Sequence, residues 1–458
     1  MPADPTVSVW EDDPVPAVLV SRPAPDLTAA WLAYTFPDPQ PEAAEYQPGT
    51  PEFRFWVAAE ALRRGADFWG RRVPGGQWQP GASLPVVLDA GEDLNAFYDR
   101  ASISFFHGTL NGDTVYSGES ADVLCHEMGH AILDAVKPEL WNAASHEVAA
   151  FHESFGDMSA ILSALQLPSL RSAILADTGG SLDQSSRLSR LAEQLGAAIR
   201  AQRPDLVDPD CLRNAVNSFS YQDPVNLPQR APASQLSSEA HSFSRVFTGA
   251  FFDGLSGMLT ARAADANAPT EEELAQMASD MADILILGVQ NAPVVPNFYA
   301  QVAAGMLEAA DATNTVYTPV LRAAFVQRAI LSLDSAANVA NLQASTESIP
   351  MTESLSSLAM SADHYGLTKP LLVHAASHAR AYVATSAATH GNGAHEPASS
   401  STAARAYVDD LFTRGRVHYG DVAKAHLNHG KRLRSHKLVA EGGAIRLHRC
   451  LFDCGLTR

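Results

Sequence analysis

The sequence predicts an α+β protein whose first part is rich in strands and whose second part is mostly helical. Three observations predict this class. Short β-like segments lie before residue 120, and segments with helical spacing of apolar residues follow it. Between them, at 121–136, stands the helical stretch "ADVLCHEMGHAILDAV". The chain has 458 residues, of which 46% are hydrophobic and 18% charged, so it can bury a sizeable core.

The elements of the first part follow from apolar spacing and turn residues. Residues 1–50, rich in Pro, Asp and Glu, indicate an extended arm or a loosely packed lead-in. "PEFRFWVAAEALRRGADFWG" has apolar residues at three- and four-residue spacing and predicts a helix over 51–70. "ASLPVVLDAG" predicts a buried strand that ends at Gly91. "AFYDRASISFFHG" and "DTVYSG" predict further strands, with "LNGD" as a turn between them.

The second part begins with a well-marked helix. Ser120 is a suitable N-cap, and Asp122 lies in the first turn, where a carboxylate favours the helix dipole. A second helix is predicted over about 145–165, and residues 243–333 have a mostly helical pattern. Residues 386–404 contain few bulky side chains and indicate a linker.

We therefore predict five parts. They are an acidic, Pro-rich extension (1–50), a β-rich lobe that ends in the two-histidine helix (51–140), a helical lobe (141–345), a partly helical segment with an Ala/Ser-rich linker (346–404) and a basic extension (405–458). The basic extension carries 11 Lys/Arg against 5 Asp/Glu, a net charge of +6. Within it, "HKLVAEGGAIRLHRCLF" predicts a hairpin that turns at Gly442–Gly443.

Charge and cysteine content exclude several classes of partner and setting. The formal net charge of −19 argues against nucleic acid or an anionic membrane surface as the main partner. No run of 18 apolar residues indicates a membrane span, and the N-terminus lacks the pattern of a secretory signal. Four cysteines in so long a chain do not make a disulfide framework. These features favour a cytoplasmic protein, or one exported without an N-terminal signal peptide; the oligomeric state stays open.

Two histidines in the stretch 121–136 indicate a metal site. His126 and His130 are four residues apart, with Glu127 directly after the first. Residues at this spacing lie on one face of a helix, so both imidazoles can offer a nitrogen to one ion. Glu127 lies one step around and can reach a water on that ion. This pattern is typical of zinc hydrolases. A buried helix that contains two histidines by chance is the alternative, because the chain has 16 histidines.

A third ligand decides between these interpretations. Metzincins have a glycine three residues and a histidine six residues after the second histidine, but Leu133 and Val136 stand there. "AAFHESFGDMSAIL" supplies Glu153 instead, with Asp157 on the same helical face. Asp157 is well spaced to accept the second ring N–H of a ligating histidine. Two histidines, one glutamate and an open water position predict a catalytic Zn2+ site.

In these motifs the chain resembles the thermolysin-like neutral metalloproteases, a gluzincin family. The likeness extends from about Leu84 to Leu333 over five segments in the family's order: "NAFYD", "ADVLCHEMGH", "HESFGD", "CLRNAV" and "EAHSFSRVFTGAFF". It implies a two-lobed fold with a β-rich N-terminal lobe, a mostly helical C-terminal lobe and the zinc cleft between them, plus extra N- and C-terminal segments. It also implies a zinc-dependent endopeptidase that acts on a peptide or protein substrate, with Glu127 as general base for a zinc-activated water.

The resemblance gives roles to five further residues. Asn95 and Ala96 would bind the backbone of an extended peptide, and Arg213 would bind a substrate carbonyl. His241 would stabilise the transition state. Trp141 stands where the family has an oxyanion-stabilising tyrosine, and its indole N–H can still donate a hydrogen bond.

The chain also departs from the family pattern. Leu236 stands where a carboxylate normally orients the later histidine, and Glu239 is the candidate to replace it. Asp122 stands at the place of a calcium ligand, but Ala164 occupies that of a partner glutamate, so the family's calcium site is incomplete.

The sequence leaves two other functions open. One is a catalytically weak or inactive zinc protein that serves as a binding module. The other is a hydrolase dedicated to one peptide precursor or to a non-peptide amide. For Cys450 and Cys454, which lie near His448, the favoured interpretation is unpaired thiols, because a metal site would lack a fourth ligand. Whether residues 1–50 or the basic extension inhibit the cleft stays open.

Overall fold

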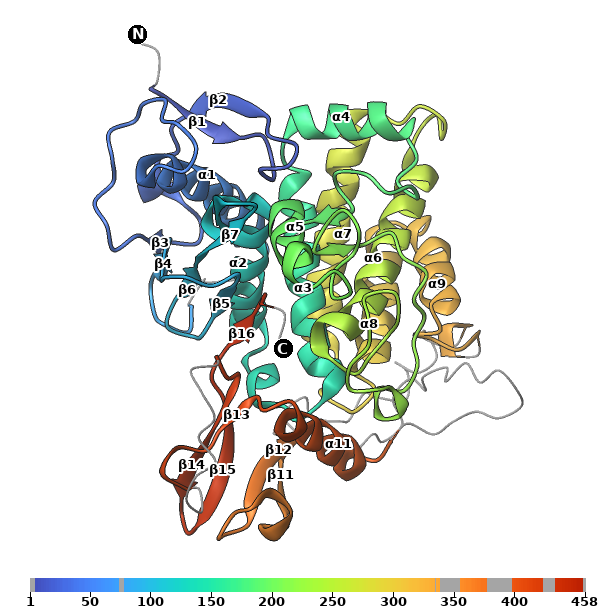
Figure 1. The fold of residues 1–458 in the computed structure, drawn as a ribbon. Coiled ribbons are helices and arrows are strands. Elements are labelled where there is room, and N and C mark those ends of the chain that lie inside the picture. Colours follow the sequence, from blue (N-terminus) through green and yellow to red (C-terminus); the bar gives the residue numbers. More distant parts are fainter. Residues whose placement is uncertain are drawn as a thin grey trace.

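The computed structural model describes residues 5–73, 78–333, 335–337, 355–376, 398–422 and 433–455, and it has an α+β fold (Figure 1). The prediction of that class is therefore confirmed. Most of the predicted linker at 386–404 lies outside these residues. Among the described residues, no single helix is long and apolar enough to cross a membrane. Helices α3 (His146–Ala164) and α4 (Pro168–Thr178) meet that test only as a pair, bent by 99° at their junction.

The first residues pack onto the molecule and do not form the loose arm that we predicted. Strands β1 (Thr6–Trp10) and β2 (Leu19–Pro23) pair antiparallel and lie beside helix α1 (Pro51–Gly70). Val7 and Val9 are fully buried, because alternate side chains of a strand point to one face and here that face meets α1. The Pro and acidic residues that suggested a loose arm lie mainly in the turns that connect these strands to α1.

A five-stranded sheet forms the β-rich part in the order β16-β5-β6-β4-β3. Strands β3 to β4 and β4 to β6 run parallel, whereas β6 to β5 and β5 to β16 run antiparallel. The bounds are β3 (Tyr34–Thr35), β4 (Leu84–Val87), β5 (Ala96–Tyr98), β6 (Ile103–Phe105) and β16 (Phe452–Asp453).

A separate hairpin precedes the two-histidine helix. Strands β7 (His107–Leu110) and β8 (Asp113–Tyr116) pair through the predicted turn. Asn111 and Gly112 have φ values of 53° and 95°, the left-handed conformation that a two-residue hairpin turn requires. This hairpin leads directly to Ser120.

Two helices lie at the centre of the molecule. Helix α2 (Ala121–Val136) begins at Ser120, whose side chain accepts a hydrogen bond from the backbone N–H of Val123. Helix α3 (His146–Ala164) begins at Ser145 and is buried along its whole length. Both starts match the predictions, because serine oxygens satisfy otherwise unpaired N–H groups of the first turn.

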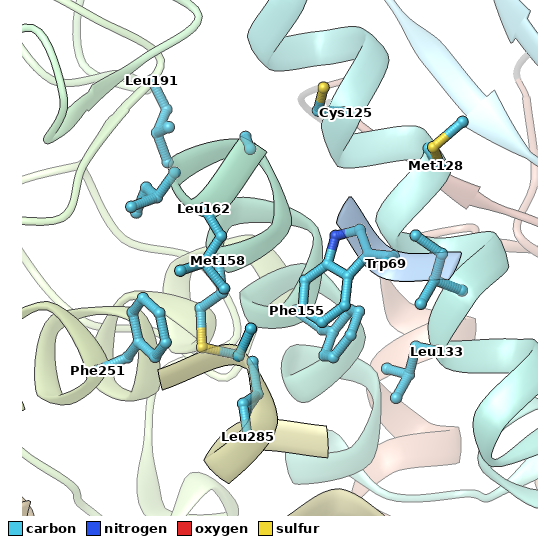
Figure 2. Close-up of a cluster of buried hydrophobic side chains, with 14 of the residues drawn as sticks. Trp69, Cys125, Met128, Leu133, Phe155, Met158, Leu162, Leu191, Phe251 and Leu285 are labelled. Atoms are coloured by element: carbon cyan, nitrogen blue, oxygen red, sulfur yellow. The ribbon is translucent and has the colours of Figure 1, made fainter. Parts of the chain in front are cut away.

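The core joins these helices to α1 and to the helical part (Figure 2). The Trp69 ring of α1 lies 5.4 Å from the Phe155 ring of α3, and its indole N–H donates to Ser159 Oγ at 2.9 Å. The remaining elements of this part are η3 (Pro138–Asn142), α4 (Pro168–Thr178), β9 (Arg190–Leu191), α5 (Glu193–Gln202), β10 (Arg213–Asn214), α6 (Ala240–Arg262), α7 (Glu271–Asn291), α8 (Phe298–Thr313) and α9 (Tyr317–Gln327).

A second sheet, with its own hydrophobic core, forms below the rest of the molecule in Figure 1. Its order is β11-β12-β15-β14-β13, and α11 packs beside it. The elements are β11 (Ser356–Met360), β12 (Leu371–Ala375), α11 (Ser400–Thr413), β13 (Val417–His418), β14 (His436–Glu441) and β15 (Ala444–Arg449).

This sheet confirms one prediction and adds to another. The predicted hairpin is β14–β15, which turns at Gly442 and Gly443, both with positive φ. The described part of the segment predicted as partly helical, 346–404, contains a short 3-10 helix (Asp363–Tyr365) and the first residues of α11, but also the unpredicted strands β11 and β12. Alternate residues of β12 are buried, a period of two that favours a strand over a helix.

Candidate metal centre

Helices α2 and α3 bring together the three predicted metal ligands. Nε2 of His126 lies 3.4 Å from Oε2 of Glu153, and Nε2 of His130 lies 3.7 Å from the same oxygen. One ligand atom from each residue lies within 4.8 Å of the other two, so the group could hold a metal ion. All three side chains are buried.

Two glycines allow the helices to approach closely enough for this arrangement. A Cβ at Gly129 of α2 would lie 2.8 Å from Ser159 Cβ, closer than such atoms are found. A Cβ at Gly156 of α3 would lie 2.6 Å from the ring of His126. The imidazole of His126 therefore rests over a position of α3 that has room for glycine alone.

Asp157 fixes the orientation of His126, as its spacing predicts. Its Oδ1 lies 3.0 Å from Nδ1 of His126, so the carboxylate can hold that nitrogen's proton and leave Nε2 free for a metal. Burial raises the pKa of Asp157, but the Arg213 guanidinium, 2.6 Å away, outweighs it and lowers that pKa to about 2. Asp157 is thus an anion over the whole physiological pH range.

The three candidate ligand atoms suit a metal ion, because their hydrogen-bonding capacity is largely unused. Nε2 of His126, Nε2 of His130 and Oε2 of Glu153 are buried, and none makes a hydrogen bond of normal geometry to another described residue. Burial lowers the pKa of His130 to about 3, so its imidazole is neutral and can ligate. Burial alone would raise the pKa of Glu153, yet the charge of His241 holds it well below its ordinary value. Burial opposes the charged form of His126, but the Asp157 and Glu153 carboxylates raise its pKa to about 9, so a bound Zn2+ would displace a proton there. Neutral imidazoles and a carboxylate are ligands that Zn2+ accepts.

Glu127 lies beside this group with both carboxylate oxygens buried, and one of them lies within 4.8 Å of Cys454 Sγ. Burial raises the pKa of Glu127 to about 8. At neutral pH such a carboxyl group is mostly protonated, so a role as general base requires a nearby cation that lowers its pKa.

His241, at the start of α6, also contacts one of the candidate metal ligands. Its Nε2 lies 3.2 Å from Oε2 of Glu153, and its Nδ1 lies 2.9 Å from Oε1 of Glu239. Burial opposes the charged form of His241, but the Glu153 and Glu239 carboxylates raise its pKa well above the ordinary value. Glu239 therefore takes the orienting position that Leu236 leaves empty, and His241 is held as a cationic donor.

The predicted substrate-binding residues lie at the site, and a segment from the far end of the chain contacts them. Strand β16 pairs with the outer edge of β5, and the backbone N–H of Cys454 donates to Ala96 O at 2.9 Å. The N–H of Gly455 donates to the side-chain oxygen of Asn95. The predicted edge strand is therefore covered in this structure by residues 452–455.

Arg213 and Trp141, for which the resemblance implies contacts with substrate, bind other residues of the chain in this structure. Arg213 binds Asp157 through Nε and Nη2, and its buried Nη1 has no hydrogen-bond partner among the described residues. Trp141 donates from its indole to Arg449 O at 3.3 Å. Its predicted role as an oxyanion donor stays a prediction and requires this contact to open.

Two residues at the site were missed by sequence reasoning. His152 is buried, and its ring stacks on Phe452 with centroids 4.0 Å apart. Cys454 brings its Sγ within 4.8 Å of a ring nitrogen of His126 and an oxygen of Glu127. The spacing of Cys450, Cys454 and His448 gave no signal of this, because the partners are more than 300 residues away in the sequence.

A pocket opens beside the site. It is lined by Leu206, Leu212, Arg213, Ala233 and His241, among others. Five arginines line this pocket (Arg203, Arg213, Arg230, Arg245 and Arg414), against four apolar residues. Such a wall is suited to hold a polar or acidic substrate side chain.

A group of acidic residues at the start of α2 replaces the expected calcium pattern. Carboxylate oxygens of Asp13, Asp122 and Glu193 lie within 4.8 Å of one another. Asp122 also accepts a hydrogen bond from Ala192 N at 2.9 Å, and Asp13 accepts one from Ser120 Oγ at 2.6 Å. Asp122 thus has Asp13 and Glu193 as acidic neighbours, whereas Ala164 leaves the family's calcium site incomplete.

No protein-family model matches this chain, and no curated protein matches it with significance. The function is therefore argued from the site itself.

Proposed function

We propose that this chain is a zinc-dependent endopeptidase of the thermolysin-like type, with His126, His130 and Glu153 as zinc ligands. The observation that carries the proposal is the convergence of their three ligand atoms within 4.8 Å, buried and beside the carboxylate of Glu127. A purely structural zinc site would have four protein ligands, whereas three leave a position open for water.

A zinc ion in this position would activate a water molecule and polarise the carbonyl of a peptide bond. Glu127 takes the proton of the attacking water and passes it to the leaving amine. His241, cationic and fixed by Glu239, donates from Nε2 to the oxygen that becomes negatively charged in the transition state. Asp157 keeps His126 in the tautomer that ligates.

The substrate is proposed to be an extended peptide. It would add as a strand to the edge of β5, with Asn95 and Ala96 as its backbone partners. The unpaired Nη1 of Arg213 is available for a substrate carbonyl, and the neighbouring pocket would receive a side chain. Such backbone pairing supports endopeptidase specificity, because it does not require a free chain end.

The arrangement of the chain is consistent with a thermolysin-like fold. The β-rich part up to α2 and the helical part from α3 to α9 would be the two lobes, with the zinc site at their junction (Figure 1). The five motifs that carry the resemblance supply residues to this one site. Strands β1 and β2 and the second sheet (β11-β12-β15-β14-β13) would be additions to that fold.

The test combines a metal analysis with a chelator-sensitive digest of a peptide library. Glu127→Gln is expected to retain one zinc per chain and to lose cleavage by a factor of about 10²–10⁴, because the general base is removed. Glu139→Gln, an exposed site on η3, is the matched control and should cleave like the parent. A Glu127→Gln protein that holds zinc and cleaves undiminished would contradict the assignment.

A further inference from the structure

The segment Phe452–Gly455 lies across the candidate centre in the position of a substrate strand. It continues from β15 of the second sheet and joins β5, as Figure 1 shows for β16. The register pairs Phe452 with Tyr98 and Asp453 with Phe97. The backbone partners that the resemblance implies for substrate are therefore occupied by the chain's own residues.

The contacts of this segment reach the catalytic side chains as well as the strand edge. The carbonyl of Asp453 lies 2.6 Å from His241 Nε2, the atom proposed to stabilise the transition-state oxygen. The Phe452 ring stacks on His152 and on the ligand His130, with centroid distances of 4.0 and 5.0 Å. Each contact corresponds to one that a bound peptide would make.

Cys454 lies beside one of the candidate ligands. Its side chain is 1% exposed, and its Sγ is within 4.8 Å of ligand atoms of His126 and Glu127, whereas the group of His126, His130 and Glu153 does not include it. Thiolate sulfur is a strong zinc ligand, so a small shift of this side chain toward a bound ion would complete a tetrahedral set.

Further contacts fasten the segment from both sides. The Arg449 guanidinium lies 4.0 Å above the Phe452 ring, and its Nε donates to Trp141 O at 3.0 Å. Trp141 returns a hydrogen bond to Arg449 O. Arg416, just before β13, pairs with the Asp453 carboxylate. The segment is thus held by side chains of the second sheet and of η3, and not by the strand pairing alone.

We propose that residues 452–455 are a built-in inhibitor of this chain, in which Cys454 supplies the fourth metal ligand and closes the water position. This inference depends on the proposed zinc site. It explains why the second sheet and α11 pack where they do: they deliver the inhibitory strand to β5. The folded chain then cleaves slowly, and cleavage or displacement of this segment raises its activity.

The ligand assignment is tested with Co2+, which binds the same kinds of nitrogen, oxygen and sulfur sites. Co2+ in the parent protein is expected to give an intense sulfur-to-metal charge-transfer band in the near ultraviolet. Cys454→Ser should abolish the band and leave the metal bound. Cys450→Ser is the matched control, because Cys450 lies two residues from β16 and outside the ligand group, and it should keep the band.

The latency is tested by cleavage of a peptide library with the same proteins. Cys454→Ser is expected to cleave at least about tenfold faster than the parent, because a tethered ligand acts at a millimolar effective concentration. Phe452→Ala combined with Cys454→Ser removes two of the segment's side-chain contacts and should cleave faster still. Adding Glu127→Gln to this double variant should abolish the gain.

The outcomes separate the two proposals. Co2+ bound at the site without a charge-transfer band, or Cys454 variants that cleave no faster than the parent, would overturn the inhibitor assignment alone. A parent chain that binds neither Zn2+ nor Co2+ would overturn the zinc site and with it both proposals.

Discussion

Asp157 contacts no substrate in the proposed mechanism, yet it contacts a candidate metal ligand, His126, and a candidate substrate-binding residue, Arg213. Its carboxylate holds Nδ1 of His126 and pairs with the buried Arg213. Asp157→Asn removes the negative charge and is expected to lower zinc affinity by about 10–100-fold, the usual loss when the partner of a ligating histidine is changed. A competition titration with a zinc chelator measures this affinity.

The matched control is Glu239→Gln, because Glu239 orients His241 and is not one of the three candidate ligands. It should slow cleavage in the Cys454→Ser background and leave zinc affinity nearly unchanged. Thermal melting of both variants shows whether each remains folded. Equal zinc affinity in the parent and the Asp157→Asn protein would contradict the orienting role of Asp157.

Sequence reasoning found those site residues that obey a local spacing rule. His126 and His130 follow from the i, i+4 geometry of a helix, and Glu153 and Asp157 follow from the same spacing on the next helix. Cys454 and Phe452 could not be found this way. Their contacts depend on a strand that pairs with residues more than 350 positions earlier, and no periodicity records such a distance.

At the scale of elements, the close packing of α2 on α3 positions the ligands. Gly156→Ala would place a methyl group 2.6 Å from the His126 ring and force that ring to move. Overpacking of this kind costs about 1–3 kcal/mol, and we expect a loss of zinc affinity of roughly tenfold or more. Zinc titration and thermal melting together separate the loss of metal from the loss of fold.

Gly254→Ala is the control for this prediction. Its Cβ would meet a Leu321 methyl at 2.6 Å, a similar overlap on α6 against α9, away from the centre. It should lower the melting temperature and leave zinc affinity unchanged. Unchanged zinc affinity in the Gly156→Ala protein would mean that the His126 ring can accommodate the added methyl group, and it would contradict the prediction.

The helices with marked starts and regular apolar spacing were predicted well, as were the two glycine-turn hairpins. α1 matches the predicted 51–70, and α2 and α3 start at the predicted serines. The strands at 356–360 and 371–375 were missed, because short strands are stabilised by their neighbours in a sheet and carry little local signal. Strand β1 was also missed, because the alternating apolar residues Val7 and Val9 stand in a segment rich in Pro and acidic residues.

At the scale of the whole molecule, the acidic group of Asp13, Asp122 and Glu193 ties the first segment to α2 and to α5. Burial raises the pKa of Asp13 to about 7, with Asp12 adding to the effect and the hydrogen bond from Ser120 opposing it. Burial likewise raises the pKa of Glu193 to about 9 and that of Asp122 well above its ordinary value.

These shifts predict how stability depends on pH. A carboxyl group whose pKa is higher in the folded chain binds its proton more tightly there, so it stabilises the fold at low pH. For Asp13 this stabilisation is complete below the ordinary value of 3.8 and is lost as pH rises to about 7. Asp13→Asn cannot ionise, so its melting temperature should fall less than that of the parent over this interval.

Asp113→Asn, at an exposed position of β8, is the control and should follow the parent curve. Melting curves at closely spaced pH values, recorded in chelator, give the comparison. If Asp13→Asn and the parent lost stability in parallel between pH 4 and 7, the acidic group would not be protonated in the folded chain.

The side chains and backbone of the strand that covers β5 indicate which chemical groups a small inhibitor of this centre should contain. Such a compound needs a flat ring to lie on His152, an oxygen acceptor one residue further for His241, and a sulfur atom beyond that for the cation. A short mercapto-peptide with this order of groups is therefore the natural starting scaffold for an affinity reagent. It would label only those molecules whose own strand has been withdrawn, and so count the active fraction in a mixed population.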